Sequence, residues 1–198
     1  MKKPIWDVEE NIGFETIAGP DGLYYKIHTT NKNKKKYAHE LAKIRKDLNL
    51  LLVYLMKNPG LWMDKKIEPG IIHTFDIHIP GWDTYMDKIL SSPDPNQVII
   101  THSRPLFSIQ EMTPNDHGII GLNKPRDLYF KNGIKWAKRR TMHLAERKSY
   151  NDLLALAIHE LTHTTCNDVE WKEDNHMYPY GSYHSFMRRC AKEIGILQ

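Results

Sequence analysis

The chain has 198 residues, and 28 Lys and Arg against 24 Asp and Glu give it a formal net charge of +4. Hydrophobic residues make up 40% and charged residues 26%, which excludes a disordered chain and fits one globular domain. The longest apolar stretch, residues 50–56, is too short for a transmembrane helix, which needs about 20 residues. No apolar segment follows the two N-terminal lysines, so we expect no signal peptide, no membrane contact and an intracellular protein, cytoplasmic or nuclear.

The first half of the chain contains patterns of both helices and strands. Apolar residues at steps of three and four predict an amphipathic helix over 37–57, which Asn58-Pro59-Gly60 ends. Alternating apolar residues predict a strand over 71–79, and a run of β-formers predicts another over 97–102. A short helix over 83–90 separates them.

The middle of the chain is rich in Pro, Gly and Asn, so we expect 103–133 to be mostly loop, with a short strand over 118–122. A further strand is predicted over 135–145. Three isolated histidines lie in or near this region, and isolated histidines are more often surface or hydrogen-bonded core residues than metal ligands. They are His102, His117 and His143.

The last third has the clearest pattern. The segment Ser149-Tyr150-Asn151-Asp152 offers N-cap candidates for a helix over 150–165, whose residues 153–158 are all apolar, as in a buried helix. Pro179 and Gly195 are typical start and stop signals for a last helix over 179–194. We therefore expect an α+β fold.

A polar cluster, His159-Glu160-Leu161-Thr162-His163, interrupts the apolar helix. Histidines four residues apart point within about 40° of each other on a helix, so both rings can bind one Zn²⁺ ion. Glu160 follows the first ligand, and in this HExxH pattern such a glutamate is the general base toward a zinc-activated water. Alternatively, both histidines hydrogen-bond in the core, or they hold a structural zinc together with Cys166.

A catalytic zinc usually takes three protein ligands and leaves a fourth position to water. The candidates for the third ligand are Cys166, Asp168, Glu170, Glu173, Asp174, His176 and His184. Asp168, Glu173 and Asp174 are also candidates to accept a hydrogen bond from a ligand histidine. Cys166 reads either as a thiol that closes the site or as a small buried residue.

The HExxH segment, followed by Trp171-Lys172-Glu173-Asp174-Asn175-His176, resembles the zincin metallopeptidases of the WLM/SprT-like group, including relatives from large DNA viruses. In that group a third histidine ends a similar segment and an aromatic residue, here Tyr180, stands four positions later. Met177 stands where the group commonly has Gly. The resemblance spans roughly residues 141–197.

The resemblance implies one Zn²⁺ per chain, held by His159, His163 and His176, and zinc-dependent hydrolysis of peptide bonds. It also implies a zincin-like fold, with a small twisted mixed sheet packed on a buried HExxH helix. For some members it implies cleavage of proteins bound to DNA. We interpret 1–198 as a single domain of this kind, with 1–36 as a candidate peripheral extension. His184 is the competing third ligand.

In this interpretation Glu160 takes a proton from water and delivers it to the leaving amine of a protein or peptide substrate. The substrate would add a strand to a sheet edge above the motif helix. Tyr180, Tyr183 and His184 are candidate oxyanion donors. The alternative is a non-enzymatic, zinc-stabilised module that binds nucleic acid or protein. Its support is three basic patches, which would also allow weak nucleic-acid contact: lysines within 32–36, Lys138-Arg139-Arg140 and Arg188-Arg189.

Overall fold

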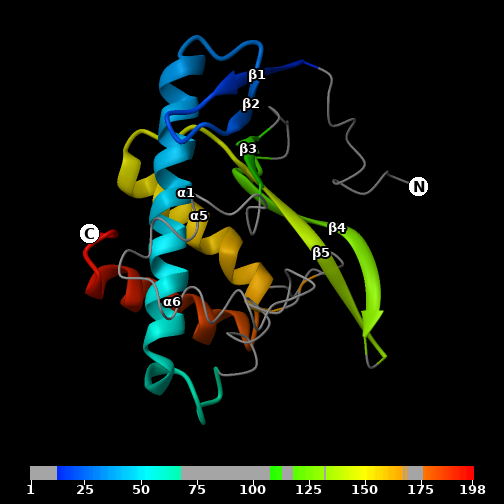
Figure 1. The fold of residues 1–198 in the computed structure, drawn as a ribbon, viewed down its shortest axis with the longest axis vertical. Coiled ribbons are helices and arrows are strands. Elements are labelled where there is room, and N and C mark those ends of the chain that lie inside the picture. Colours follow the sequence, from blue (N-terminus) through cyan, green and yellow to red (C-terminus); the bar gives the residue numbers. More distant parts are fainter. Residues whose placement is uncertain (1–12, 68–107, 113–117, 132, 167, 169–175) are drawn as a thin grey trace.

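The computed structural model describes residues 13–67, 108–112, 118–131, 133–166, 168 and 176–198, with the backbone alone for 126–131 and 134–139. The predicted strands at 71–79 and 97–102 and the predicted helix at 83–90 lie outside these residues. The described part has an α+β fold (Figure 1). Its elements are β1 (Phe14–Ala18), β2 (Tyr24–His28), α1 (Lys34–Lys57), the 3-10 turn η2 (Pro59–Leu61), β3 (Ser108–Glu111), β4 (Gly121–Lys131), β5 (Ile134–Leu144), α5 (Tyr150–Thr165) and α6 (Tyr180–Glu193).

The three predicted helices are confirmed. Helix α1 begins at Lys34, three residues before the predicted start, so part of the lysine-rich segment is helical rather than loop. Helix α5 has the predicted bounds, and the Ser149 side chain caps it by accepting a hydrogen bond from Asp152 N. Helix α6 ends before Gly195, which has φ +74°, a left-handed conformation that glycine adopts at little cost.

A mixed three-stranded sheet with the order β3-β5-β4 lies beside α5. Strand β5 pairs in parallel with β3 and antiparallel with β4, with Gly121 opposite Leu144 and Pro125 opposite Arg140. Within the described residues, β4 therefore has one unpaired edge. The predicted strand at 135–145 is confirmed as β5, which begins and ends one residue before the predicted bounds.

The prediction that 103–133 is mostly loop is wrong, because β3 and the eleven-residue β4 lie within it. Pro125 suggested a break, but a proline is tolerated in an edge strand, where its missing N–H removes no required ladder bond. The predicted short strand at 118–122 is the start of β4. The missed signal was Asn132-Gly133, a pair favoured in the two-residue turns that join antiparallel strands.

The core lies between α1, α5, α6 and the sheet. In Figure 1 the long α1 runs beside both C-terminal helices, and the β4–β5 pair extends away from them. Leu48, Ile158 and Met187, one from each helix, are fully buried in this core. Hydrogen bonds between elements add to the apolar contact: Tyr37 Oη donates to Leu144 O over 2.8 Å, and Tyr150 Oη donates to Asp47 Oδ2 over 2.6 Å.

The β1–β2 hairpin places Tyr25 and Ile27 in the same core. It is tied to the sheet by Glu111, whose carboxylate accepts hydrogen bonds from His28 N and from Asn31 Nδ2, the latter over 2.7 Å. The described part of residues 1–36 thus contributes to the packing; the organisation of 1–198 as one domain stays a prediction. Among the described helices, none combines the length and the apolar character that crossing a membrane requires.

We predict that Tyr37→Phe lowers the free energy of unfolding by about 1 kcal/mol, the usual net value of one buried hydrogen bond. The loss stays small because Leu144 O keeps the hydrogen bond from Met112 N. Denaturant unfolding measures the change. Tyr24→Phe is the matched control, since Tyr24 is 73% exposed, and an equal loss in both variants would contradict the role given to Tyr37.

Candidate metal centre

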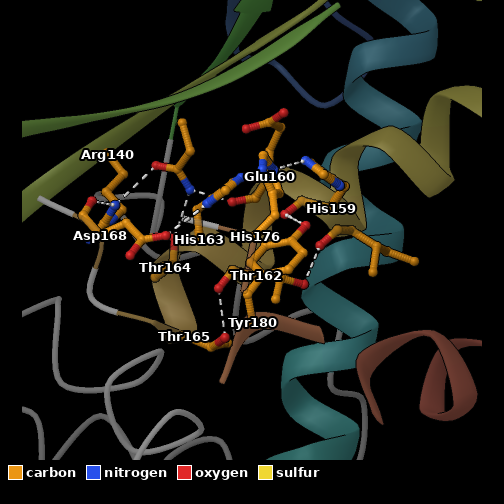
Figure 2. A network of polar contacts seen from close by, with 12 residues as sticks. Arg140, His159, Glu160, Thr162, His163, Thr164, Thr165, Asp168, His176 and Tyr180 are labelled. Atoms are coloured by element: carbon orange, nitrogen blue, oxygen red, sulfur yellow. Dashed lines mark hydrogen bonds and ion pairs between the residues drawn. The ribbon is translucent and has the colours of Figure 1, made fainter. Parts of the chain in front are cut away.

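Three histidines converge where α5 and α6 approach each other (Figure 2). His159 and His163 lie one turn apart in the second half of α5, and His176 stands four residues before α6. One ring nitrogen from each lies within 4.8 Å of the other two. The structure thus brings together the three residues that the sequence analysis chose as ligands.

The spacing of these nitrogens suits a metal ion. His159 Nε2 and His176 Nε2 are 3.1 Å apart. Two ligands at about 2.0–2.1 Å from a tetrahedral zinc would be separated by about 3.3–3.4 Å, so only a small adjustment is needed. Neutral imidazole nitrogens are ligands that zinc accepts readily, whereas magnesium and calcium prefer oxygen.

The environment favours the neutral form of two of these imidazoles. Burial lowers the pKa of His159 to about 3, and the neighbouring His163, His176 and His184 add to the effect because their charges would repel. Burial likewise lowers the pKa of His176, and His163 contributes. A neutral ring keeps a lone pair for a metal at neutral pH, so His159 and His176 are already in the protonation state that binding requires.

Asp168 orients one of the three rings. Its Oδ2 lies 2.8 Å from His163 Nδ1, which leaves Nε2 as the nitrogen that is available to a metal. A carboxylate on the far nitrogen of a ligand histidine fixes the tautomer and makes the other nitrogen more basic. Of the three acids proposed for this role, Asp168 fills it; Glu173 and Asp174 lie outside the described residues.

Glu160 is buried between α5 and the first residue of β4. Its side chain is 3% exposed and is not part of the three-histidine cluster. A Cβ atom on Gly121 would overlap Glu160 Oε1, so the carboxylate fits only because residue 121 has no side chain. Burial raises the pKa of Glu160 to about 8, and a divalent cation beside it would favour the ionised form.

Tyr180 packs among the histidines. Its ring centroid is 4.8 Å from that of His163 and 4.9 Å from that of His176, and its hydroxyl donates to His159 O over 3.1 Å. Tyr180 therefore supports the histidine rings by packing against them.

His184, the competing third ligand, has its ring centroid 5.5 Å from that of His159 but is outside the cluster. Tyr183 is buried.

Other candidates lie elsewhere. Cys166 is half-buried, remains a free thiol and is outside the histidine cluster. His143 is a core residue on β5, with Nδ1 3.1 Å from Gln110 Nε2, as expected of an isolated histidine. The remaining candidates fall outside the described residues: His102, His117 and Glu170.

Three residues of the site were missed by the sequence analysis. Gly121 makes room for Glu160, and Asn123 Nδ2 donates to Glu160 O and to Thr164 Oγ1. Arg140 was assigned to a basic surface patch, which is wrong, because it is 2% exposed and donates to Asp168 O. No sequence signal marks Arg140 as buried, since a strand alternates faces but does not reveal which face is covered.

Comparisons with protein-family models, with curated proteins and with solved structures found no match.

We predict about one zinc ion per purified chain, and loss of that ion on changing His159, His163 or His176 to Ala, because each removes one of three nitrogens. Elemental analysis and competition with a chromophoric chelator measure stoichiometry and affinity. His184→Ala is the matched control and should retain zinc. If His184→Ala emptied the site while His176→Ala left it full, the third ligand would be reassigned.

Proposed function

We propose that the protein is a zinc-dependent peptidase with a zincin-like active site, in which Glu160 is the general base. The resemblance to the WLM/SprT-like zincins and the arrangement around His159, His163 and His176 both support this proposal. The mixed sheet beside the HExxH helix is compatible with that fold.

The observation that carries the proposal is the number and kind of side chains at the site. Among the described residues, three histidines gather and no fourth His, Cys, Asp or Glu joins them. Structural zinc sites are usually closed by four protein ligands, whereas catalytic sites use three and keep one position open. A carboxylate one residue after the first ligand is unnecessary in a structural site and required in the catalytic one.

Zinc held by these histidines would supply Lewis acidity toward water and toward the carbonyl of the scissile bond. The chain itself supplies the proton transfers. Glu160 accepts a proton from the attacking water and then donates it to the leaving amine, so one carboxylate serves both steps. Burial at 3% exposure excludes bulk water from this carboxylate and limits its rotation, which favours both transfers.

The substrate is proposed to bind along β4. This strand has an unpaired edge within the described sheet, and its first residue contacts Glu160. An extended peptide that pairs with an edge strand gains backbone hydrogen bonds whatever its sequence. A peptide bound at the start of β4 would have one of its peptide bonds next to Glu160, the proposed general base. This arrangement is the reason for proposing a peptide as the substrate.

We predict that Glu160→Gln retains zinc and lowers turnover by roughly 100-fold or more, the usual contribution of a positioned base. Digestion of casein and of a peptide library with added zinc, repeated with a chelator, measures it. A zinc-stabilised module without enzymatic activity would show no turnover in the wild type either. Wild-type turnover by the variant would contradict the assignment of Glu160.

We predict that Gly121→Ala lowers peptide turnover by about 100-fold while zinc remains bound, because the new methyl group displaces the Glu160 carboxylate. Gly121 does not have a positive φ, so alanine suits its backbone. Gly181→Ala is the matched control, since a Cβ there contacts nothing within 4 Å. Equal activity in the two variants would show that Glu160 does not act from its observed position.

A further inference from the structure

Arg140 on β5 is a buried cation beside the metal centre. It is 2% exposed, and its Nη1 donates to Asp168 O over 2.9 Å and to Asn123 Oδ1 over 3.3 Å. Its Nε and Nη2 are buried and have no hydrogen-bond partner among the described residues. Burial lowers the pKa of Arg140 to about 10, so the guanidinium is still charged at neutral pH. Burying a charge is costly, which raises the question of what this one does.

The first contact of Arg140 fixes Asp168. The backbone of Asp168 is held on both sides, because its N–H donates to His163 O over 3.0 Å and its carbonyl accepts from Arg140. Its carboxylate is thereby left 2.8 Å from His163 Nδ1, and Figure 2 shows Arg140, Asp168 and His163 side by side. The position of the His163 ring therefore depends on where Arg140 holds Asp168.

The second contact of Arg140 leads to the same helix from the opposite direction. Asn123 Oδ1 accepts from Arg140, and Asn123 Nδ2 donates to Glu160 O and, over 2.9 Å, to Thr164 Oγ1. The contacts form a closed ring that runs from β5 through Asp168 to α5 and returns through β4. A closed ring restrains each member more than an open chain does.

We propose that Arg140 is a positioning residue for the metal centre: it holds Asp168 so that His163 keeps its proton on Nδ1 and presents Nε2 toward His159 and His176. This inference rests on the metal site of the proposed function and not on peptidase activity. It assigns the buried cation a task that packing alone does not need, because an apolar side chain of similar volume would fill the space without desolvating a charge.

The first test is the tautomer of His163 in the metal-free protein. Ring-nitrogen NMR shifts distinguish a proton on Nδ1 from one on Nε2. In the wild type we expect Nδ1–H, and in Arg140→Met and in Asp168→Asn we expect a mixture in which Nε2–H is substantially populated. Arg140→Gln is a second variant, neutral but polar. The test can be read from whichever of the two Arg140 variants folds.

The second test is zinc affinity, measured by chelator competition. Each single variant should bind zinc about 10- to 100-fold more weakly than the wild type, the usual effect of losing the partner of a ligand histidine. Adding Arg140→Met to Asp168→Asn should cause no further loss, because the arginine acts through Asp168. Tyr37→Phe is the control for a general loss of stability, and it should leave both the affinity and the tautomer unchanged.

Two results would overturn the inference. One is a folded Arg140→Met or Arg140→Gln protein with the wild-type tautomer and a zinc affinity within about threefold of the wild type. The other is a fully additive loss in the double variant. If the wild type bound no zinc, the metal site of the proposed function would fail, whereas the tautomer measurement would still test the link between Arg140 and His163.

Discussion

The burial of polar side chains on α5 is the constraint on which the rest of the structure depends. His159 and His163 lie on a helix whose other residues are largely apolar and packed, and Glu160 is 3% exposed. Polar groups in such a position are unfavourable unless neighbours compensate them. The surroundings of α5 supply partners for two kinds of group: Asp168 pairs with a ring nitrogen, and Asn123 with a backbone carbonyl and a hydroxyl. Gly121 gives the Glu160 carboxylate space but no partner.

Two different kinds of support surround the histidines. On the sheet side the support is a set of hydrogen bonds: side chains of β4 and β5 hold Thr164 and the backbone of Asp168, and the Asp168 carboxylate in turn contacts the His163 ring. On the α6 side the contacts are aromatic: the Tyr180 ring packs against those of His163 and His176, and its hydroxyl makes one hydrogen bond to α5. The hydrogen bond from Asp168 fixes the rotation of the His163 ring, while the aromatic contacts limit how far the rings can move.

The helices and the HExxH face were predictable because periodicity, caps and stop signals are local properties of the sequence. The strand β4 was missed beyond its first residues, because Pro125 indicates a break unless the strand lies at a sheet edge, and an edge is not a local property of the sequence. The same limit applies at the site. His159, Glu160 and His163 follow from spacing on one helix, whereas the choice of Asp168 and the burial of Arg140 depend on which segments meet.

The contacts that form the closed ring around Arg140 join residues that are near one another along the chain. Arg140 and Asp168 are 28 residues apart and Asn123 and Glu160 are 37 apart, whereas the bond from Tyr37 to Leu144 spans 107 residues. Closing a short loop sacrifices less chain entropy than closing a long one. The hydrogen bonds around the candidate site thus join residues that are close in sequence, whereas α1 packs against this part of the chain from a distant part of the sequence.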